Sequence, residues 1–205
     1  MTFDGSNWSA PVDDHLGLLG GEAVSCASSS FCVAYQYRYS VTFNGSRWSA
    51  PQIITSDPYG AAAWVSCVSS SFCEAVGSTE AETFDGSTWS VPQTIDPNGN
   101  LTSVSCVSSS FCAAVDRQGN ALSFDGSTWS APLLIDSAGL VSVSCPSSSF
   151  CAAVEYEDNA VSFDGSSWST PQPIDTMKNL LPVSCASSSF CVAVHPTGTA
   201  IIGRA

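Results

Sequence analysis

Residues 106–112 read CVSSSFC, and this stretch decides the fold because the chain contains it five times. Near copies occupy residues 26–32 (CASSSFC), 67–73 (CVSSSFC), 145–151 (CPSSSFC) and 185–191 (CASSSFC). The first cysteines of successive copies are 41, 39, 39 and 40 residues apart. Five copies at nearly constant spacing indicate a repeat protein, in which each unit folds as one supersecondary element and stacks on its neighbours.

A second motif, F(D/N)GSxW, recurs with the same period. Each copy places an acidic or amide side chain four residues before a tryptophan, and successive tryptophans are 40, 41, 40 and 39 residues apart. The tryptophans are Trp8, Trp48, Trp89, Trp129 and Trp168. The acidic and amide residues are Asp4, Asn44, Asp85, Asp125 and Asp164.

One unit, residues 101–135, shows which elements the repeat predicts. LTSVSC, ALSFDG and TWSAPLLI alternate apolar and polar residues, FCAAVD is short and apolar, and no window has helical spacing. The unit therefore predicts four short strands. Asp-Gly or Asn-Gly between the third and fourth strands indicates a tight turn that needs positive φ. A proline in the fourth strand suits a sheet edge, because proline cannot donate to a ladder.

Four short strands in a unit of about 40 residues are typical of a propeller blade. We predict an all-β, five-bladed β-propeller with four antiparallel strands per blade, forming a single domain over residues 1–205. The last unit lacks the tryptophan-bearing strand, and residues 3–11 supply one. We therefore expect the N-terminal strand to complete the C-terminal blade and close the ring. A β-solenoid is the alternative, but it would carry capping ends rather than complementary ones.

The ten cysteines predict five disulfides rather than a metal site. Thiolate metal sites usually show Cys-x2–4-Cys pairs, whereas the spacing here is Cys-x5-Cys. In a hairpin between the first two strands, the paired cysteines would face each other. Each bridge would contribute about 2 kcal/mol. We expect no metal, no cofactor and a secreted or extracellular protein. The pairs are Cys26–Cys32, Cys67–Cys73, Cys106–Cys112, Cys145–Cys151 and Cys185–Cys191.

The charge composition limits the partners that the protein can bind. The chain has 18 acidic and 5 basic side chains, a formal net charge of −13. Such a surface repels phosphate, which argues against nucleic acid and anionic membranes as partners. No apolar run approaches the ~18 residues of a spanning helix, so we expect no membrane insertion. We also expect a monomer.

The repeated unit with FDGSxW resembles the five-bladed β-propeller lectins of the tachylectin type, in which similar blades each bind a sugar. Residues 123–129 and 162–168, Ser-x-Asp-Gly-x-x-Trp, also resemble the Asp-box of sialidase-type propellers. The Asp-box reads Asp-x-Gly-x-x-Trp, so the match departs by one residue. In Asp-box families this hairpin is structural and lies away from the active site. That second resemblance therefore implies a fold rather than a function.

The repeated motifs suggest a multivalent carbohydrate-binding lectin with five equivalent sites. The ten motif residues named above would form them, each tryptophan stacking on a sugar ring and the neighbouring Asp or Asn accepting hydrogen bonds from its hydroxyls. The alternative is structural: the tryptophan packs between blades and the aspartate caps its own turn. Weak sites on one chain would gain affinity through multivalency.

The non-repeated connections suggest a different function, binding of a cationic protein or use as a display scaffold. In a meander they lie on the face opposite the repeated turns, and 13 of the 18 acidic residues fall in or beside them. Solubilising loops are the plainer interpretation. The candidate aromatic and arginine anchors are Tyr35, Tyr37, Arg38, Tyr39, Tyr59 and Trp64.

Enzyme activity finds little support in the sequence, and we expect a non-catalytic protein. A glycoside hydrolase needs two carboxylates across one bond, and Glu155 or Glu157 with Asp116 are the candidates. Nothing in their spacing singles them out. The histidines, His15 and His195, lie near opposite ends of the chain, and ring closure would bring them to one face.

Overall fold

The computed structural model describes residues 6–10, 23–36, 39–54, 64–175 and 182–204, and its regular elements are all strands. These strands form five antiparallel sheets, which we call blades 1 to 5 in chain order. Within this part of the chain, no helix is long and apolar enough to cross a membrane.

Each of the first four blades has four strands, as the repeat predicts. Blade 1 consists of β1 (Ala23–Ser28), β2 (Phe31–Gln36), β3 (Tyr39–Phe43) and β4 (Gln52–Ile53). Blade 2 consists of β5 (Trp64–Ser69), β6 (Phe72–Gly77), β7 (Glu80–Phe84) and β8 (Gln93–Thr94). Blade 3 consists of β9 (Leu101–Ser108), β10 (Phe111–Asp116), β11 (Asn120–Phe124) and β12 (Leu133–Leu134). Blade 4 consists of β13 (Leu140–Ser147), β14 (Phe150–Glu155), β15 (Asn159–Phe163) and β16 (Gln172–Pro173).

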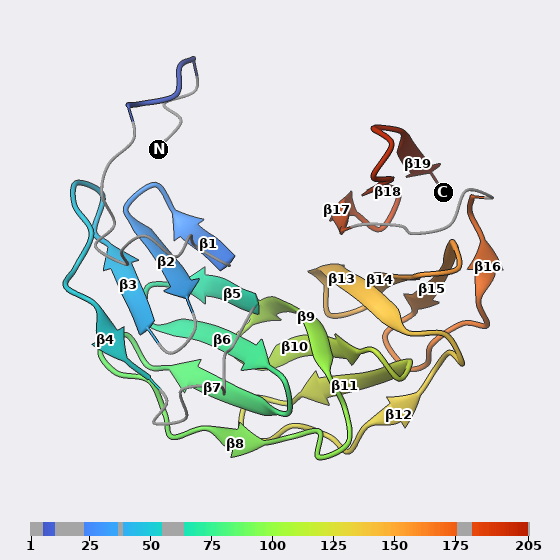
Figure 1. Cartoon of the computed structure of the whole chain (residues 1–205), viewed down its shortest axis with the longest axis horizontal. Coiled ribbons are helices and arrows are strands. Elements are labelled where there is room, and N and C mark those ends of the chain that lie inside the picture. Colours follow the sequence, from blue (N-terminus) through green and yellow to red (C-terminus); the bar gives the residue numbers. More distant parts are fainter. Residues whose placement is uncertain (1–5, 11–22, 37–38, 55–63, 176–181, 205) are drawn as a thin grey trace.

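Blade 5 has three strands among the described residues: β17 (Val183–Ser187), β18 (Phe190–Val194) and β19 (Ala200–Arg204). The prediction that the N-terminal strand completes this blade is not met by residues 6–10, which pair with none of these strands. Figure 1 shows these residues far from β19. In blade 4 the outer strand lies four residues beyond Trp168. The corresponding positions after Trp8 fall outside the described residues.

The blades follow one another along an arc, with the first strand of each blade innermost (Figure 1). The inner strands β1, β5, β9, β13 and β17 contact their neighbours in this order. The fourth strands lie outermost and are shorter than predicted, two residues each. A bridge between the tryptophan and the preceding phenylalanine, such as Phe124 to Trp129, holds the rest of this segment. Proline cannot donate to the ladder, which explains the break between bridge and strand.

All five predicted disulfides are confirmed, and no cysteine is free. Each joins the first two strands of one blade across their hairpin, with Cα–Cα distances of 3.9–4.0 Å. The glycine of FDGS packs on this hairpin. Gly126 has φ +99°, and a Cβ there would lie 3.2 Å from Ser110 Cα in the disulfide-bonded turn. The two repeated motifs therefore fold against each other within a blade.

Serine hydroxyls join the inner strands of neighbouring blades. In each case the serine before the first cysteine accepts a hydrogen bond from the backbone N–H of the next blade's first cysteine. The N–O distance is 3.0 Å from Cys145 to Ser105 and 2.9 Å at the other three boundaries. The remaining donor–acceptor pairs are Cys67 with Ser25, Cys106 with Ser66, and Cys185 with Ser144. Serine spacing alone does not predict this role, because the two partners of each bond lie about 40 residues apart.

Phenylalanines and small apolar residues fill the space between blades. The phenylalanine that starts the second strand of one blade lies beside the phenylalanine that ends the third strand of the next. Ring centroids are 6.0–6.2 Å apart for Phe31–Phe84, Phe72–Phe124 and Phe111–Phe163. The buried clusters also cross these boundaries, since Val115 of blade 3 packs with Leu140 and Val143 of blade 4. Each blade is therefore stable only as part of the stack.

Replacing Ser105 by alanine tests the serine link. The Cys145 N–H would lose its partner in a part-buried position, which costs about 1–3 kcal/mol. We expect a lower denaturant midpoint for S105A than for wild type. Ser148, exposed in the neighbouring hairpin, provides the matched control, and S148A should unfold like wild type. Equal midpoints for all three proteins would show that the link contributes no stability.

Candidate functional site

The aspartates and the asparagine of the repeated motif hold their own turns. Asp125 Oδ1 accepts hydrogen bonds from the Ser127 and Thr128 backbone N–H groups at 2.9 Å and from the Ser127 hydroxyl at 2.8 Å. Asn44 Oδ1 makes the equivalent contacts at 2.9–3.1 Å. These donors, the Thr128 N–H foremost, lower the pKa of Asp125 to about 2, and the corresponding donors do the same for Asp85 and Asp164. Asp4 lies outside the described residues.

The motif tryptophans of blades 1 to 4 pack on the phenylalanine of their own hairpin, and those of blades 2 to 4 face the preceding blade. Ring centroids of Phe43–Trp48, Phe84–Trp89, Phe124–Trp129 and Phe163–Trp168 are 5.3–5.5 Å apart. The Trp89 indole N–H donates to Ser40 Oγ of blade 1 at 3.0 Å. These four are partly buried, whereas Trp8 is 69% exposed. Within one repeat of blades 2 to 4, the Asp thus contacts its own turn, whereas the tryptophan packs toward another blade.

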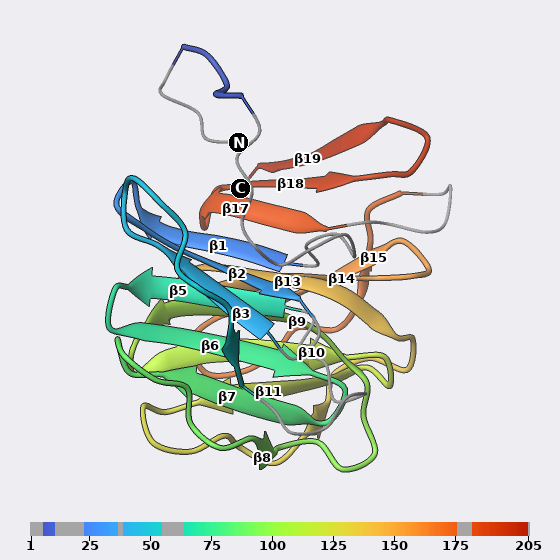
Figure 2. The same ribbon diagram turned by 60° about the vertical axis from the view of Figure 1, so that its left-hand side comes forward.

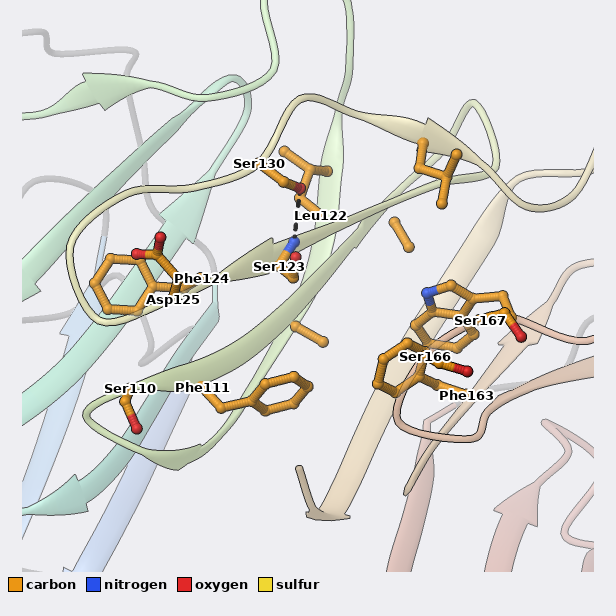
Figure 3. Close-up of a pocket in the computed structure, with 14 residues that line it drawn as sticks. Ser110, Phe111, Leu122, Ser123, Phe124, Asp125, Ser130, Phe163, Ser166 and Ser167 are labelled. Atoms are coloured by element: carbon orange, nitrogen blue, oxygen red, sulfur yellow. Dashed lines mark hydrogen bonds between the residues drawn. The ribbon is translucent and has the colours of Figure 1, made fainter. Parts of the chain in front are cut away.

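A pocket of about 390 Å³ opens between blades 3 and 4, on the side of the repeated turns (Figure 3). It brings together Asp125 of blade 3 and Trp168 of blade 4, two predicted site residues from different repeats. Phe111 and Phe163 form part of its aromatic wall. Leu133 of the outermost strand β12 also lines it. Serines complete the lining: Ser110, Ser123, Ser130, Ser166 and Ser167.

The residue after the second cysteine is valine in blades 1 and 5, glutamate in blade 2 and alanine in blades 3 and 4. Ala113 lines the pocket in blade 3, and its counterparts are Val33, Glu74, Ala152 and Val192. Between blades 4 and 5 a smaller pocket, about 260 Å³, includes Phe150, Ser162 and Gly203. Gly203 pairs with Cys191 as Phe163 pairs with Cys151, so this pocket keeps Phe150 and Phe190 but lacks a counterpart of Phe163. Of these two pockets, the one between blades 3 and 4 is the larger and the one that a motif tryptophan lines.

Blade 2 carries two buried carboxyls, one in its second strand and one in its third. Glu74 and Glu82 are 0% and 2% exposed. They stand where blade 3 has Ala113 and Leu122, both pocket-lining. Burial raises the pKa of Glu74 to about 7, and the hydrogen bond that the Thr83 hydroxyl donates to it opposes this rise. Burial, followed by the charges of Glu80 and Glu74, raises the pKa of Glu82 to about 8. The sequence analysis missed both residues, although apolar counterparts in the other repeats mark them.

The carboxylates considered for catalysis organise turns on the opposite side of the blades. Asp116 is fully buried, and its Oδ1 accepts from the Gln118 and Asn120 backbone N–H groups at 2.8 and 2.7 Å. Glu155, equally buried, accepts from Glu157 N–H at 3.0 Å and from the Asn159 N–H at 3.1 Å. Both end the second strand of their blade, so they hold equivalent turns rather than face one bond.

His195 takes the same place in blade 5. Its Nδ1 lies 2.8 Å from Thr197 Oγ1 in the turn between β18 and β19. His15 lies outside the described residues, so its predicted proximity to His195 stays a prediction. Across the described residues, no group of three or more His, Cys, Asp or Glu side chains is placed to hold a metal ion.

A buried pair of acids crosses the boundary between blades 2 and 3. Asp96, 2% exposed, follows β8, and Asp116 ends β10. Burial and then the neighbouring Asp116 raise the pKa of Asp96 to about 6. Part of the acidic charge assigned to this side of the molecule is therefore buried and inaccessible to a partner.

The candidate anchors of this irregular side are only partly at the surface. Tyr35 is fully buried, because its ring faces blade 2 and meets Trp89 edge-on at 6.1 Å. Trp64 packs against the core between blades 2 and 3. Tyr39 is partly buried. Tyr37, Arg38 and Tyr59 lie outside the described residues.

Comparison with solved structures confirms the propeller fold. The structure is similar to the WD40 β-propeller domain of Doa1, with a TM-score of 0.71 and 10% identity over 90% of this chain and 64% of that chain. It is also similar to YCF48 bound to D1 peptide, with a TM-score of 0.67 and 14% identity over 88% of this chain and 64% of that chain. The chain thus spans just under two thirds of each. No protein-family model and no curated protein matches the sequence.

The fold and its bridges therefore define an all-β propeller of five sheets, each carrying one disulfide. The comparisons establish this architecture and do not extend to the lectin type or to the Asp-box.

Stability should fall as pH rises because of Glu74 and Glu82. Both pKa values are raised in the fold, to about 7 and 8, from an ordinary glutamate value of 4.5. Their contribution to the free energy of unfolding is fully present below pH 4.5, declines above it, and is lost as pH rises through 7 to 8. Each group changes stability by up to about 1.4 kcal/mol per pH unit.

Glu82→Leu restores the residue type found at Leu122, and chemical denaturation of this variant between pH 4.5 and 9 should show a shallower decline. The exposed Glu157→Gln serves as control and should keep the wild-type slope. A decline in E82L as steep as in wild type would contradict the assignment.

Proposed function

We propose that this protein is a secreted, non-catalytic binding module that takes a carbohydrate ligand in the pocket between blades 3 and 4. The observation that carries the proposal is the meeting of Asp125 and Trp168 at one pocket. A sugar presents C–H faces to aromatic rings and hydroxyls to polar side chains. Trp168 and Phe163 offer the first kind of surface, and Asp125 with the pocket serines offers the second.

The charge state of Asp125 supports this ligand class. Its pKa of about 2 keeps the carboxylate ionised, and an ionised carboxylate only accepts hydrogen bonds. Oδ1 is occupied by the turn, while Oδ2 makes one long contact, 3.4 Å to the Thr128 hydroxyl. Oδ2 thus retains capacity to accept from a sugar hydroxyl.

The proposal departs from five equivalent sites. At the boundary between blades 2 and 3, Glu74 stands in place of pocket-lining Ala113. The smaller pocket between blades 4 and 5 has Gly203 where Phe163 stands. We therefore expect one strong site per chain. Five disulfides support secretion, because such bridges persist in oxidising compartments.

Neighbouring leucines of β12 give a sharp test. Leu133 lines the pocket and is 58% exposed, whereas Leu134 is 65% exposed, points to the other side of the strand and lines no part of it. Leu133→Arg would fill the pocket without disturbing the core. The oxidised wild-type protein is applied to a glycan array, and the strongest hit is titrated by calorimetry. We expect one ligand per chain and at least tenfold weaker binding by L133R.

Leu134→Arg is the matched control and should bind like wild type. Asp125→Asn should keep its turn, because Asn44 makes the same contacts in blade 1, and should weaken sugar binding through loss of charge. Equal binding by wild type and L133R would move the site elsewhere. An array without hits, with the protein folded, would refute the carbohydrate proposal.

A peptide is the second candidate ligand. It rests on the exposed outer strands, since Leu133 and Leu134 of β12 leave one strand edge apolar. An extended chain could add to such an edge. The similar YCF48 structure is one bound to D1 peptide, which makes a protein ligand a reasonable alternative for this fold.

A further inference from the structure

Blade 1 exposes a face that blades 3, 4 and 5 bury. The valine two residues before the first cysteine packs against the preceding blade in blades 3, 4 and 5, where Val104, Val143 and Val183 are 8%, 4% and 8% exposed. Val24 holds this position in blade 1 and is 64% exposed. The face of blade 1 that would meet a preceding blade is therefore open.

Blade 5 exposes the complementary face. The third residue after the second cysteine faces the next blade in blades 1 to 4, where Tyr35, Val76, Val115 and Val154 are at most 1% exposed. Val194 holds this position in blade 5 and is 39% exposed. Beside it, Ile202 is 53% exposed where blade 4 has Ser162, and Phe190 is 38% exposed. Blade 5 thus presents three apolar side chains to solvent.

The polar groups of the two faces also complement each other. Ser184 is the counterpart of Ser144, whose hydroxyl accepts from the next blade's Cys185 N–H at 2.9 Å. Ser184 is exposed, and none of the described residues donates to its hydroxyl. Cys26 is exposed as well, and none of the described serines accepts from its N–H. Blade 5 thus offers the serine acceptor of the link between blades, and blade 1 offers the N–H donor.

We propose that the open face of blade 5 docks on the open face of blade 1 of a second copy of this chain, repeating the contact between neighbouring blades. In this docking the Ser184 hydroxyl accepts from the Cys26 N–H, and Phe190 lies beside Phe43 as Phe111 lies beside Phe163. Figure 1 shows blades 1 and 5 at the two ends of the arc. Figure 2 shows β1 and β17 in the upper half of the molecule. The contact joins two different surfaces, so it is head-to-tail.

Charge favours a contact made by these faces. The chain carries a net charge of −13, which opposes association of two copies at low salt. The residues named on both faces are uncharged. Added salt screens the repulsion between copies and leaves the apolar contact intact. Association should therefore strengthen with sodium chloride, the opposite of binding driven by opposite charges.

Two single variants test the head-to-tail geometry. Val24→Asp places a charge only in the apolar face of blade 1, and Ile202→Asp places a charge only in the apolar face of blade 5. Sedimentation velocity on wild type at rising protein concentration should show dimers and larger species, increasing with salt. Each variant alone should stay monomeric. An equimolar mixture of V24D and I202D should form dimers and nothing larger, because one intact pair of faces remains.

Val91→Asp is the control, since Val91 is 79% exposed away from both faces, and it should associate like wild type. Circular dichroism confirms that each variant is folded. A wild type that stays monomeric at all concentrations and salt levels overturns the proposal and leaves closure within one chain as the fate of these faces. A mixture of the two variants that stays monomeric overturns the head-to-tail geometry. Both outcomes are independent of sugar binding.

Discussion

The hydrogen bond from a cysteine N–H to the preceding blade's serine is the contact on which the architecture depends. The inner strand of each blade lies at a sheet edge, where backbone groups would otherwise lack partners. A direct ladder between inner strands would merge the blades into one sheet. The serine hydroxyl satisfies the N–H of Cys145 while holding the next strand at side-chain distance, so each blade keeps its own orientation. This requirement explains why serine precedes the first cysteine in all five repeats.

Repetition in this chain encodes structure, and departures from repetition encode the features that distinguish one boundary from another. Asp125 and Gly126 form the same turn in their blade as Asn44 and Gly45 in theirs, with the same contacts. The position of Ala113 is different. A small side chain there leaves a pocket, whereas Glu74 at the equivalent position places a buried carboxyl in its stead. The residue at this one variable position therefore helps to decide whether the space between two blades holds a pocket or a buried carboxyl.

The sequence predicted what lies within a repeat and missed what lies between repeats. Alternation and cysteine spacing predicted the strands and the disulfides, because both depend on residues a few positions apart. The site was predicted as Asp125 with Trp129, whereas the pocket joins Asp125 to Trp168. The difference arises because a tryptophan faces the preceding blade and its aspartate lies at the turn, a direction that spacing alone cannot give. The sequence also predicted that the N-terminal strand completes blade 5, and residues 6–10 do not pair with that blade, because such pairing depends on how far each blade turns relative to the next.

The two classes of carboxylate respond to pH in opposite ways, which follows from where the fold places them. The turn carboxylates, such as Asp125, accept hydrogen bonds that favour the charged form, so their pKa lies near 2 and they stay ionised around neutrality. Glu74 and Glu82 are buried between blades, so their pKa values rise to about 7 and 8. As pH rises through neutrality, the turn carboxylates keep their negative charge unchanged, while Glu74 and Glu82 of blade 2 become negatively charged. Blade 2 also contacts both blade 1 and blade 3. A charge that forms there weakens the contact between blades and leaves the hairpins intact, so pH acts on the stack of blades before it acts on any single one.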